Sequence, residues 1–506
     1  MKFELRGITK RFPGVVANDG VNLSISTGEV LALIGENGAG KSTLMNVLYG
    51  IYRADEGELL IDGLAVHFSS PADAIAAGIG MVHQHFMLVP VMTVAENVVL
   101  GVEPTGRFGS LDIAEARRMV REVSDKYKLE LDPDALIEDL PVGVRQRVEI
   151  VKVLMRDAKI VVFDEPTAVL TPSEILEFFE IVRTLVAAGK GVIFITHKLK
   201  EALTIADRIN VLRRGKVVGE ATPSTTDENR VAEMMVGRAV QLVVDKRAAA
   251  PGDTVLALRN VSVVEPDGRT VVDDVSFEVR SGEIVGIAGV QGNGQTELVE
   301  AIAGLRRVAG GSMSLSGRDM TQDSPRERHA AGMAHIPEDR QRQGLVVDMS
   351  ITENLVLTRY HDAEFSNGVR MNWSAAAEKA AAMVAAYDIR TSDPAQAAST
   401  LSGGNQQKVI VARELSRDIT VAVAAQPTRG IDVGSIEYVH AQMVKERDAG
   451  VAMLVVSTEL DEVMSLSDRV LVMYRGKIVA DLDPKKVSHM DVGLYMAGSR
   501  PGGAAA

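Results

Sequence analysis

The sequence predicts an α/β protein in which one type of domain occurs twice. Three observations lead to this prediction: apolar strand-like runs alternate with helical stretches, a glycine-rich loop stands between a strand and a helix, and the two halves of the chain share their motifs. At 506 residues the chain is too long for one hydrophobic core. We therefore expect two domains, each with a largely parallel central sheet and a helical insertion.

The repeat shows as segments that match at two fixed offsets. "LSISTGEVLALIGENGAGKSTLMNVLYGI" at 23–51 matches "FEVRSGEIVGIAGVQGNGQTELVEAIAGL" at 277–305, an offset of 254 residues. "IVVFDEPT" matches "VAVAAQPT", and "FITHKLKEAL" matches "VVSTELDEVM", both at an offset of 261. The second copy therefore has seven extra residues, and "EDRQRQGL" at 338–345 is the candidate place for them.

The predicted elements follow the same order in each half. Two strands come first, then an apolar strand (VLALI in the first half) whose glycine loop opens a helix. An alanine- and charge-rich helical stretch follows, then an apolar strand that ends in acids or their replacements, another helix and another strand. The charged, Ala/Pro/Gly-rich "DKRAAAPGDT" marks the boundary. We expect a first domain at 1–240, a linker at 241–253, a second domain at 254–497 and a disordered tail at 498–506.

Composition and charge exclude several classes of protein. The net charge of −13 argues against a nucleic-acid partner, and the absence of cysteine excludes disulfides and thiolate metal sites. We find no apolar run long enough to cross a bilayer. The first residues, MKFELRGITKRF, carry charges where a signal peptide has its apolar region. We expect a soluble, cytoplasmic protein without a pore of its own.

The first half contains the residues of a nucleotide-hydrolysing site. "GENGAGKS" matches the P-loop pattern between a strand and a helix, where backbone N–H groups hold phosphates, Lys41 neutralises the β- and γ-phosphate oxygens and Ser42 binds Mg²⁺. "IVVFDEP" ends a strand with Asp164, suited to the metal, and Glu165, suited to aligning or deprotonating water; two solvated acids are the alternative. The nucleotide-binding residues predicted here are Gly35, Glu36, Asn37, Gly38, Ala39, Gly40, Lys41, Ser42 and Thr43.

The order of the motifs resembles that of ABC transporter ATPases. A P-loop, "VHQH", a signature, a DEPT-type Walker B motif and a histidine are all present, and "LSGGNQQKVIVAREL" at 401–415 is the most specific. The tandem layout is similar to the ATPase subunit of bacterial monosaccharide and nucleoside importers, and "GVQGNGQTELVEAIAGL" and "AAQPTRGIDVG" look most like the nucleoside branch. The resemblance implies two RecA-like cores, each with an antiparallel β subdomain and an inserted helical subdomain, that use ATP and Mg²⁺.

The same resemblance implies roles for single residues. Phe12 would stack on adenine, Gln84 would link the metal and the attacking water to a permease, and His197 would contact the γ-phosphate. The alternatives are a core or surface aromatic, a structural H-x-H pair around Gln84, and a packed core histidine. We favour the functional roles. The predicted catalytic residues are Glu165, His197, Gln84 and Lys41, and the predicted metal ligands are Ser42, Gln84 and Asp164.

The second half has lost this chemistry. The replacements are Gln295 for Lys41, Ala425 for Asp164, Gln426 for Glu165, Thr458 for His197, Glu338 for Gln84 and Pro266 for Phe12. A cation about 4 Å from a phosphate contributes about 4 kcal/mol at an effective dielectric near 20, so the loss of the lysine matters. We expect negligible hydrolysis at a degenerate site. Its predicted residues are Gly289, Gly292, Gly294, Gln295, Thr296, Glu338, Ala425, Gln426, Thr458 and Pro141.

The signature motifs are degraded in the opposite sense. The first half reads "LPVGVRQ", where Pro141 lacks both the hydroxyl and the N–H of a serine. The second half keeps the predicted nucleotide contacts Ser402, Gly403, Gly404 and Asp432. In the family the halves pair head to tail, here within one chain, so that each ATP lies between one P-loop and the other half's signature. This predicts one hydrolytic and one degenerate site, the latter either empty or holding ATP.

The resemblance also implies partners. They are membrane permease subunits, with this chain peripheral on the cytoplasmic face of the membrane, and indirectly an extracytoplasmic solute-binding protein. The permease would contact each half between its core and its helical insertion, near Gln84 and Glu338; the arginines of "EDRQRQGL" either dock it or form a solvated loop. A soluble twin-cassette ATPase acting on ribosomes or nucleic acid is the alternative, disfavoured by the short linker and acidic charge. A regulatory nucleotide-binding protein is disfavoured by the complete catalytic set, and the solute stays open.

Overall fold

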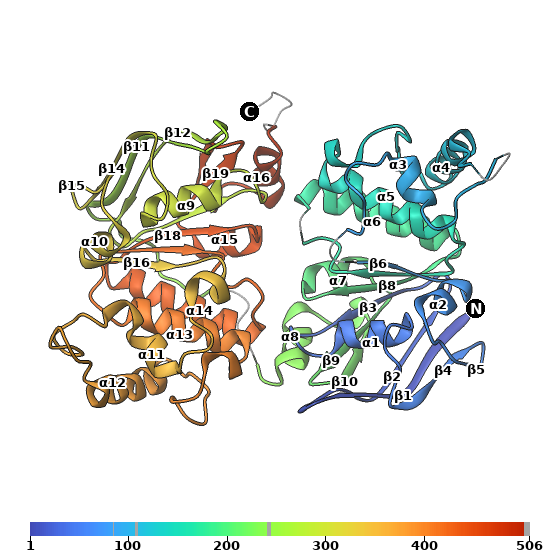
Figure 1. The fold of residues 1–506 in the computed structure, drawn as a ribbon, viewed down its shortest axis with the longest axis horizontal. Coiled ribbons are helices and arrows are strands. Elements are labelled where there is room, and N and C mark those ends of the chain that lie inside the picture. The colour runs from blue at the N-terminus through green and yellow to red at the C-terminus, as the bar shows by residue number, and fades with distance from the viewer. Residues whose placement is uncertain (84–85, 107–109, 169, 240–243, 500–506) are drawn as a thin grey trace. The chain divides into compact units, whose positions relative to one another are not determined.

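The computed structural model describes residues 1–83, 86–106, 110–168, 170–239 and 244–499 (Figure 1). The chain divides into two compact units, Met1–Val240 and Gln241–Ala506. Each unit contains one four-stranded sheet and one six-stranded sheet with the same order of strands. The predicted α/β class, with one architecture present twice, is confirmed.

Unit 1 is built on a central sheet of order β10-β9-β3-β8-β7-β6, in which only the β9–β10 pair is antiparallel. Its strands are β3 (Val30–Ile34), β6 (Ile79–Val82), β7 (Ile160–Asp164), β8 (Gly191–Thr196), β9 (Arg208–Arg213) and β10 (Lys216–Ala221). The antiparallel sheet, of order β2-β1-β4-β5, contains β1 (Lys2–Phe12), β2 (Val15–Ser26), β4 (Glu56–Ile61) and β5 (Leu64–Val66). The helices are α1 (Lys41–Leu48), α2 (Pro71–Ala76), α3 (Val94–Val99), α4 (Ile113–Tyr127), α5 (Val142–Met155), α6 (Pro172–Ala187), α7 (Leu199–Ile205) and α8 (Glu228–Val236), with 3₁₀ turns at Ile137–Asp139 and Pro223–Thr225.

Unit 2 repeats this plan with a central sheet of order β16-β17-β18-β13-β19-β20. Its strands are β13 (Ile284–Ala288), β16 (Met333–Ile336), β17 (Val421–Ala425), β18 (Ala452–Ser457), β19 (Arg469–Tyr474) and β20 (Lys477–Leu482). The antiparallel sheet contains β11 (Thr254–Val264), β12 (Thr270–Arg280), β14 (Gly310–Leu315) and β15 (Arg318–Asp319). The helices are α9 (Gln295–Ala303), α10 (Pro325–Ala330), α11 (Ile351–Val356), α12 (Trp373–Ala386), α13 (Gly403–Leu415), α14 (Val433–Asp448), α15 (Leu460–Leu466) and α16 (His489–Met496), with a π-helical turn at Arg340–Gly344 and 3₁₀ turns at Leu357–Arg359 and Ala398–Thr400.

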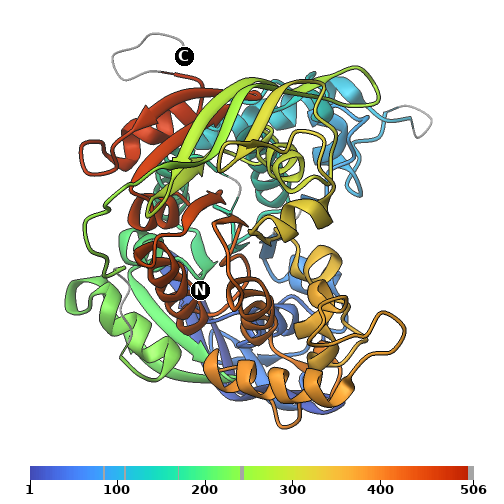
Figure 2. The ribbon, with the colours of Figure 1, turned by 90° about the vertical axis from the view of Figure 1, so that its left-hand side faces the viewer.

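Burial explains why the central strands are continuous apolar runs. Every residue of β3 and β8 is buried, as expected for parallel strands that are covered on both faces. The inserted helices are those between β6 and β7 in unit 1 (α3 to α5) and between β16 and β17 in unit 2 (α11 to α13). In each unit they and the antiparallel sheet lie on opposite sides of the central sheet (Figure 1). Figure 2 shows this for unit 2, with β11, β12 and β14 in yellow-green at the top and α12 in orange at the bottom. Among the described residues, no helix is long and apolar enough to cross a membrane.

The seven extra residues of the second copy are spread over three places. Asn97 and Asn354 are structural counterparts: both are fully buried, and each accepts a hydrogen bond from the backbone N–H eight residues before it. They are 257 positions apart, whereas the two P-loops are 254 positions apart, so three extra residues lie between the P-loop and this asparagine. The helix caps Asp112 and Asn372 are 260 positions apart, which adds three more extra residues. Leu136 and Ala397, which form matching β-bridges with Thr93 and Ser350, are 261 positions apart, which adds the seventh. The expectation that 338–345 holds the whole excess is therefore wrong, because length differences are absorbed wherever a surface connection can lengthen.

The described part of the expected linker packs onto unit 2. Val244 lies against its hydrophobic core. Lys246 Nζ donates hydrogen bonds of 2.7 and 2.6 Å to the carbonyls of Leu466 and Ser467. The guanidinium of Arg447, which is only 1% exposed, donates to the carbonyl of Arg247. Residues 244–247 are therefore anchored to unit 2.

Candidate nucleotide sites

The topology of unit 1 brings the P-loop, Glu165 and His197 to one edge of its central sheet. The P-loop follows β3, His197 follows β8, and Asp164 is the last residue of β7. Since β3, β8 and β7 are neighbouring parallel strands, their carboxyl ends lie side by side. This edge is where ligands bind in open parallel sheets.

In the first P-loop the lysine folds back onto the loop itself. Gly40 adopts a left-handed conformation, with φ 103°, at the start of α1. Lys41 is 6% exposed, and its Nζ donates hydrogen bonds of 2.7 and 3.0 Å to the carbonyls of Gly35 and Glu36. Burial lowers the pKa of Lys41, against the opposing effect of the carboxylates of Glu165 and Asp164. The ammonium is therefore held where phosphate oxygens would replace the carbonyls as its partners.

Asp164 and Ser42 form the oxygen pair expected of a magnesium site. Burial raises the pKa of Asp164, as does the neighbouring Glu165, whereas Lys41, His83 and a hydrogen bond with Ser42 lower it. That hydrogen bond brings the hydroxyl and the carboxylate together. Both are the hard oxygen ligands that Mg²⁺ prefers, so the residues present fit this ion.

Glu165 and His197 are paired beside the metal position. Glu165 has a positive φ of 48°, a strained conformation for a residue with a side chain, and its N–H donates to the carbonyl of Ile195 at 3.0 Å. Its Oε1 lies 3.1 Å from Nδ1 of His197. Burial raises the pKa of Glu165, but the hydrogen bond and charge of His197 and the charge of Lys41 outweigh it, so the pKa is lowered. The carboxylate is thus ionised and suited to orient or deprotonate water.

The family resemblance also predicts roles for Phe12 and Gln84, of which the structure describes only Phe12. Phe12, at the end of β1, is 38% exposed and contacts the ring of Tyr52 edge-on at 5.5 Å between centroids. Its ring is therefore on the surface and not part of the core. Gln84, predicted as a catalytic residue and metal ligand, lies outside the described residues.

Unit 2 keeps the backbone frame of the nucleotide site. Gly294 has φ 101°, like Gly40, and Gln295 Nε2 donates to the carbonyl of Val290 at 3.2 Å, in the manner of Lys41. Gln426 has φ 47°, and its Oε1 accepts hydrogen bonds of 3.2 Å from both the N–H and the hydroxyl of Thr458. The neutral Gln–Thr pair thus stands where Glu165 and His197 stand in unit 1.

In unit 2 an ion pair occupies the position that matches the predicted metal site of unit 1. Thr296 Oγ1 donates to Glu338 Oε2 at 3.0 Å, and Arg429 Nη1 donates to Glu338 Oε1 at 2.6 Å. Ala425, in place of Asp164, offers no ligand. Because Glu338 is engaged by a guanidinium, this set of residues does not fit Mg²⁺. Arg429 is not among the residues that the sequence predicts for this site; its only signal in the sequence is an arginine where the first half has Ala168.

Two of the residues predicted to contact nucleotide from unit 2, Ser402 of the signature and Asp432, cap helices. Ser402 caps α13, and Asp432 caps α14 by accepting hydrogen bonds of 2.8 Å from the N–H and the hydroxyl of Ser435. Gly404 is required for close approach, because a Cβ there would overlap the Ser435 hydroxyl. In unit 1 Pro141 precedes α5 without a side-chain cap. The sequence interpretation named Asp432 for nucleotide contact and missed its role as a cap.

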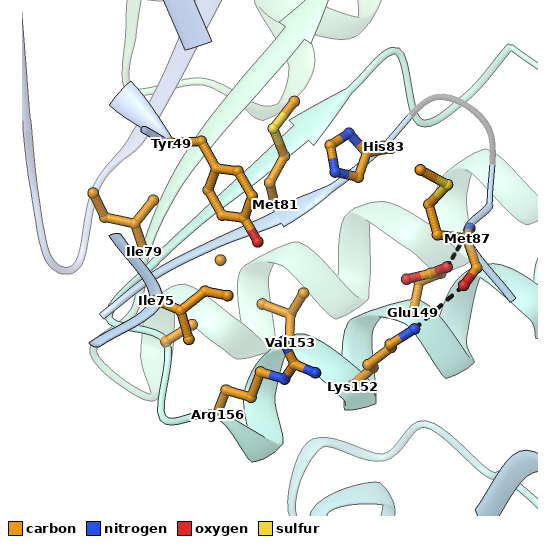
Figure 3. A pocket seen from close by; sticks show the side chains of 12 residues that line it. Tyr49, Ile75, Ile79, Met81, His83, Met87, Glu149, Lys152, Val153 and Arg156 are labelled. Carbon is orange, nitrogen blue, oxygen red and sulfur yellow. Dashed lines mark hydrogen bonds between the residues drawn. The ribbon is translucent and has the colours of Figure 1, made fainter. Parts of the chain in front are cut away.

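Each unit has a pocket between its central sheet and its inserted helices. The unit 1 pocket, of about 160 Å³, contains Tyr49, Met81 and His83, and Glu149 and Lys152 bind the backbone of Met87 at its rim (Figure 3). The unit 2 pocket, of about 350 Å³, lies at the matching position. It is lined by the imidazoles of His329, His335 and His361 and by Arg413. Burial lowers the pKa of His335 and of His329.

Known proteins match this chain over nearly its whole length. The model of the ABC transporter family matches residues 18–168 and 272–429. The chain is 48% identical to the guanosine import ATP-binding protein NupO of Bacillus subtilis (strain 168), over 98% of this chain and 97% of that protein. It is 46% identical to the nucleoside import ATP-binding protein NupA of Lactococcus lactis subsp. cremoris (strain MG1363), over 97% of each. It is 45% identical to the glucose import ATP-binding protein TsgD13 of Haloferax volcanii, over 98% of this chain and 95% of that protein.

Proposed function

Since the chain belongs to the ABC transporter family and is a transport ATPase, we propose that it energises the import of a nucleoside or simple sugar through a separate membrane permease. Relatives named for guanosine, nucleosides and glucose support these two solute classes, with nucleosides favoured by the sequence motifs. The observation that carries the mechanism is the contrast between the two units. In unit 1 the carboxylate of Glu165 pairs with His197, whereas in unit 2 the Glu338–Arg429 pair fills the position that matches the predicted metal site.

We assign hydrolysis to the first P-loop. Mg²⁺ held by Ser42, Asp164 and Gln84 would neutralise charge on the β- and γ-phosphate oxygens. Lys41 leaves the loop carbonyls to bind the same oxygens, and the ionised Glu165 orients and deprotonates the attacking water. The remaining contacts are His197 with the γ-phosphate and Phe12 with adenine.

The halves are proposed to pair head to tail within one chain. The first P-loop then shares its ATP with Ser402, Gly403 and Gly404 of the second signature and with Asp432 of the loop that follows the second Walker B segment. The other composite site combines Gln295 with the degraded signature at Pro141 and hydrolyses nothing. ATP binding would hold the halves together, and hydrolysis and phosphate release would let them part, which moves the permease between its inward and outward states.

The pockets are the proposed docking places for the permease. Both lie between the central sheet and the inserted helices, where the family resemblance predicts this contact. The protein would then sit on the cytoplasmic face of the membrane, while an extracytoplasmic solute-binding protein delivers the solute to the other side.

Affinity purification from detergent-solubilised cells tests the proposal. The tagged chain should retain membrane permease subunits, and vesicles reconstituted with the complex should take up radiolabelled guanosine or glucose only when ATP and Mg²⁺ are supplied to the ATPase side. Recovery of ribosomes or nucleic acid without a permease would support the twin-cassette alternative and refute import.

A further inference from the structure

The segment that follows β16 in unit 2 forms contacts that the proposed function does not use. Residues Arg340–Gly344 form a π-helical turn, which Asp339 caps by accepting hydrogen bonds of 3.0 Å from the N–H groups of Gln341 and Arg342. Single π-helical turns are rare and are frequently found at functional sites. The turn is therefore a candidate for holding neighbouring elements of unit 2 in place.

Arg340 connects this turn to residues 429–432, the loop before α14, which we call the Asp432 loop. Its Nη1 donates to the carbonyl of Arg429 at 2.7 Å and its Nη2 to the carbonyl of Gly430 at 3.1 Å. These two carbonyls lie just ahead of Asp432, which caps α14. Two charge-assisted hydrogen bonds from one planar guanidinium fix the direction of the loop as well as its position.

The same guanidinium lies against the start of the signature helix. A Cβ added at Gly403 would be 2.8 Å from Arg340 Nη2, so the guanidinium lies close to the backbone at this glycine. Arg340 thus touches both parts of unit 2 that are predicted to face the first P-loop: the loop leading to Asp432 and the N-terminal end of α13.

Further contacts connect the whole segment to these elements. Arg429 is bound at two points: its side chain donates a hydrogen bond to Glu338, and its backbone carbonyl accepts one from Arg340. At the other end the buried Arg413 of α13 donates to the carbonyl of Gly344 at 2.8 Å. Unit 1 has Ala168 in place of Arg429, so the ion pair belongs to unit 2 alone.

The segment also reaches the pocket of unit 2. Pro337 and Gln343, which flank Arg340 on the chain, line that pocket. A permease element bound in this pocket would contact the chain on both sides of Arg340, the residue that binds the Asp432 loop.

We propose that Arg340 is a positioning residue for ATP hydrolysis at the first P-loop: it fixes the Asp432 loop and the start of α13 relative to each other. The inference rests on the proposed head-to-tail pairing. Arg340 itself touches no phosphate; it acts through the residues it holds.

The test compares Arg340→Gln with Arg342→Gln in the assembled complex. Arg342 is a matched control, since it lies on the same turn, loses the same charge and has a side chain 88% exposed. Arg340→Gln should lower kcat on the order of tenfold to a hundredfold while the Kd for ATP at the first P-loop changes little, because a misplaced group affects the chemical step most. Arg342→Gln should stay within about twofold of wild type, since it removes only a weak surface contact.

Arg340→Lys keeps the charge but not the two-pronged hydrogen bond, so it should recover only part of kcat and also serves if Arg340→Gln folds poorly. Unchanged kcat in both Arg340 variants would overturn the inference. So would loss of activity in Arg342→Gln with Arg340→Gln intact, which would assign the turn to permease docking. Glu165→Gln measured in parallel tests the proposed function separately: if this variant retains half the wild-type rate, the assignment of all hydrolysis to the first P-loop fails, whatever the Arg340 variants do.

Discussion

Exchanging Lys41 for glutamine gives the first P-loop the residue that the second has at the matching position. Both side chains fold back onto carbonyls of their own loops, Lys41 onto Gly35 and Glu36, and Gln295 onto Val290. The backbone frames match as well. We therefore expect Lys41→Gln to fold like the wild type and to lose little besides the charge.

The size of the effect follows from two opposing contributions. A charge about 4 Å from a phosphate contributes about 4 kcal/mol at an effective dielectric near 20. To reach the phosphate, Lys41 gives up two hydrogen bonds of 2.7 and 3.0 Å, each with a net value of about 1.5 kcal/mol because the donor is charged. The remaining 1 kcal/mol, approximately, corresponds to ATP bound about fivefold more weakly.

Equilibrium titration of the full chain with a fluorescent ATP analogue and Mg²⁺ measures this change. The tightest binding phase should weaken in Lys41→Gln, while the thermal unfolding midpoint should stay within a few degrees of wild type. The reciprocal Gln295→Lys variant is the matched comparison and should strengthen the weaker phase. Unaltered affinity in Lys41→Gln would refute the reasoning, because the buried ammonium would then not be a phosphate ligand.

Three further predictions concern unit 2. With a non-hydrolysable ATP analogue, electron paramagnetic resonance should count one bound Mn²⁺ per chain, because Arg429 occupies the metal position of unit 2; two ions would contradict this. Burial lowers the pKa of His335, so below its usual value of about 6.5 the unfolded chain binds more protons than the folded one. The free energy of unfolding, from urea titrations, should therefore decrease as the pH falls from about 7.5 to about 5.5. His335→Gln should flatten that decrease, and an unchanged slope would exclude this histidine. Gly404→Ala adds a methyl group that overlaps the Ser435 hydroxyl and should destabilise unit 2 by about 1–3 kcal/mol in the same titrations. Gly143→Ala, whose methyl group meets only a flexible glutamate, should cost less, and equal costs would contradict the packing argument.

Local motifs were the most predictable part of the site. The P-loop pattern fixes the turn from Gly35 to Ser42 because consecutive residues determine it, and the acids of "IVVFDEP" lie at a strand end next to that turn. The two offsets between the halves, 254 and 261 residues, identify Gln295 and Gln426 as the counterparts of Lys41 and Glu165. The pattern needs only neighbouring residues and the offsets need only a comparison of the two halves, so both can be read directly from the sequence.

Long-range contacts could not be predicted in this way. Arg429 reaches Glu338 across 91 positions, and Arg340 reaches carbonyls 89 and 90 positions ahead. No periodicity of the sequence encodes such contacts, because tertiary packing creates them. The cap formed by Asp432 is different, because an aspartate directly before a helix predicts an N-cap from the sequence alone. The family resemblance assigns Asp432 to the nucleotide, and this assignment does not include the cap.

Steady-state ATP hydrolysis by the assembled complex, compared between the wild type and Glu165→Gln, tests the one-site mechanism most directly. The variant keeps the shape of the side chain and removes the carboxylate that pairs with His197. Turnover at background level is the predicted result, since the Gln426–Thr458 pair supplies no base in unit 2. Retention of roughly half the wild-type rate would mean that the second site hydrolyses ATP without a carboxylate, and the one-site mechanism would be wrong.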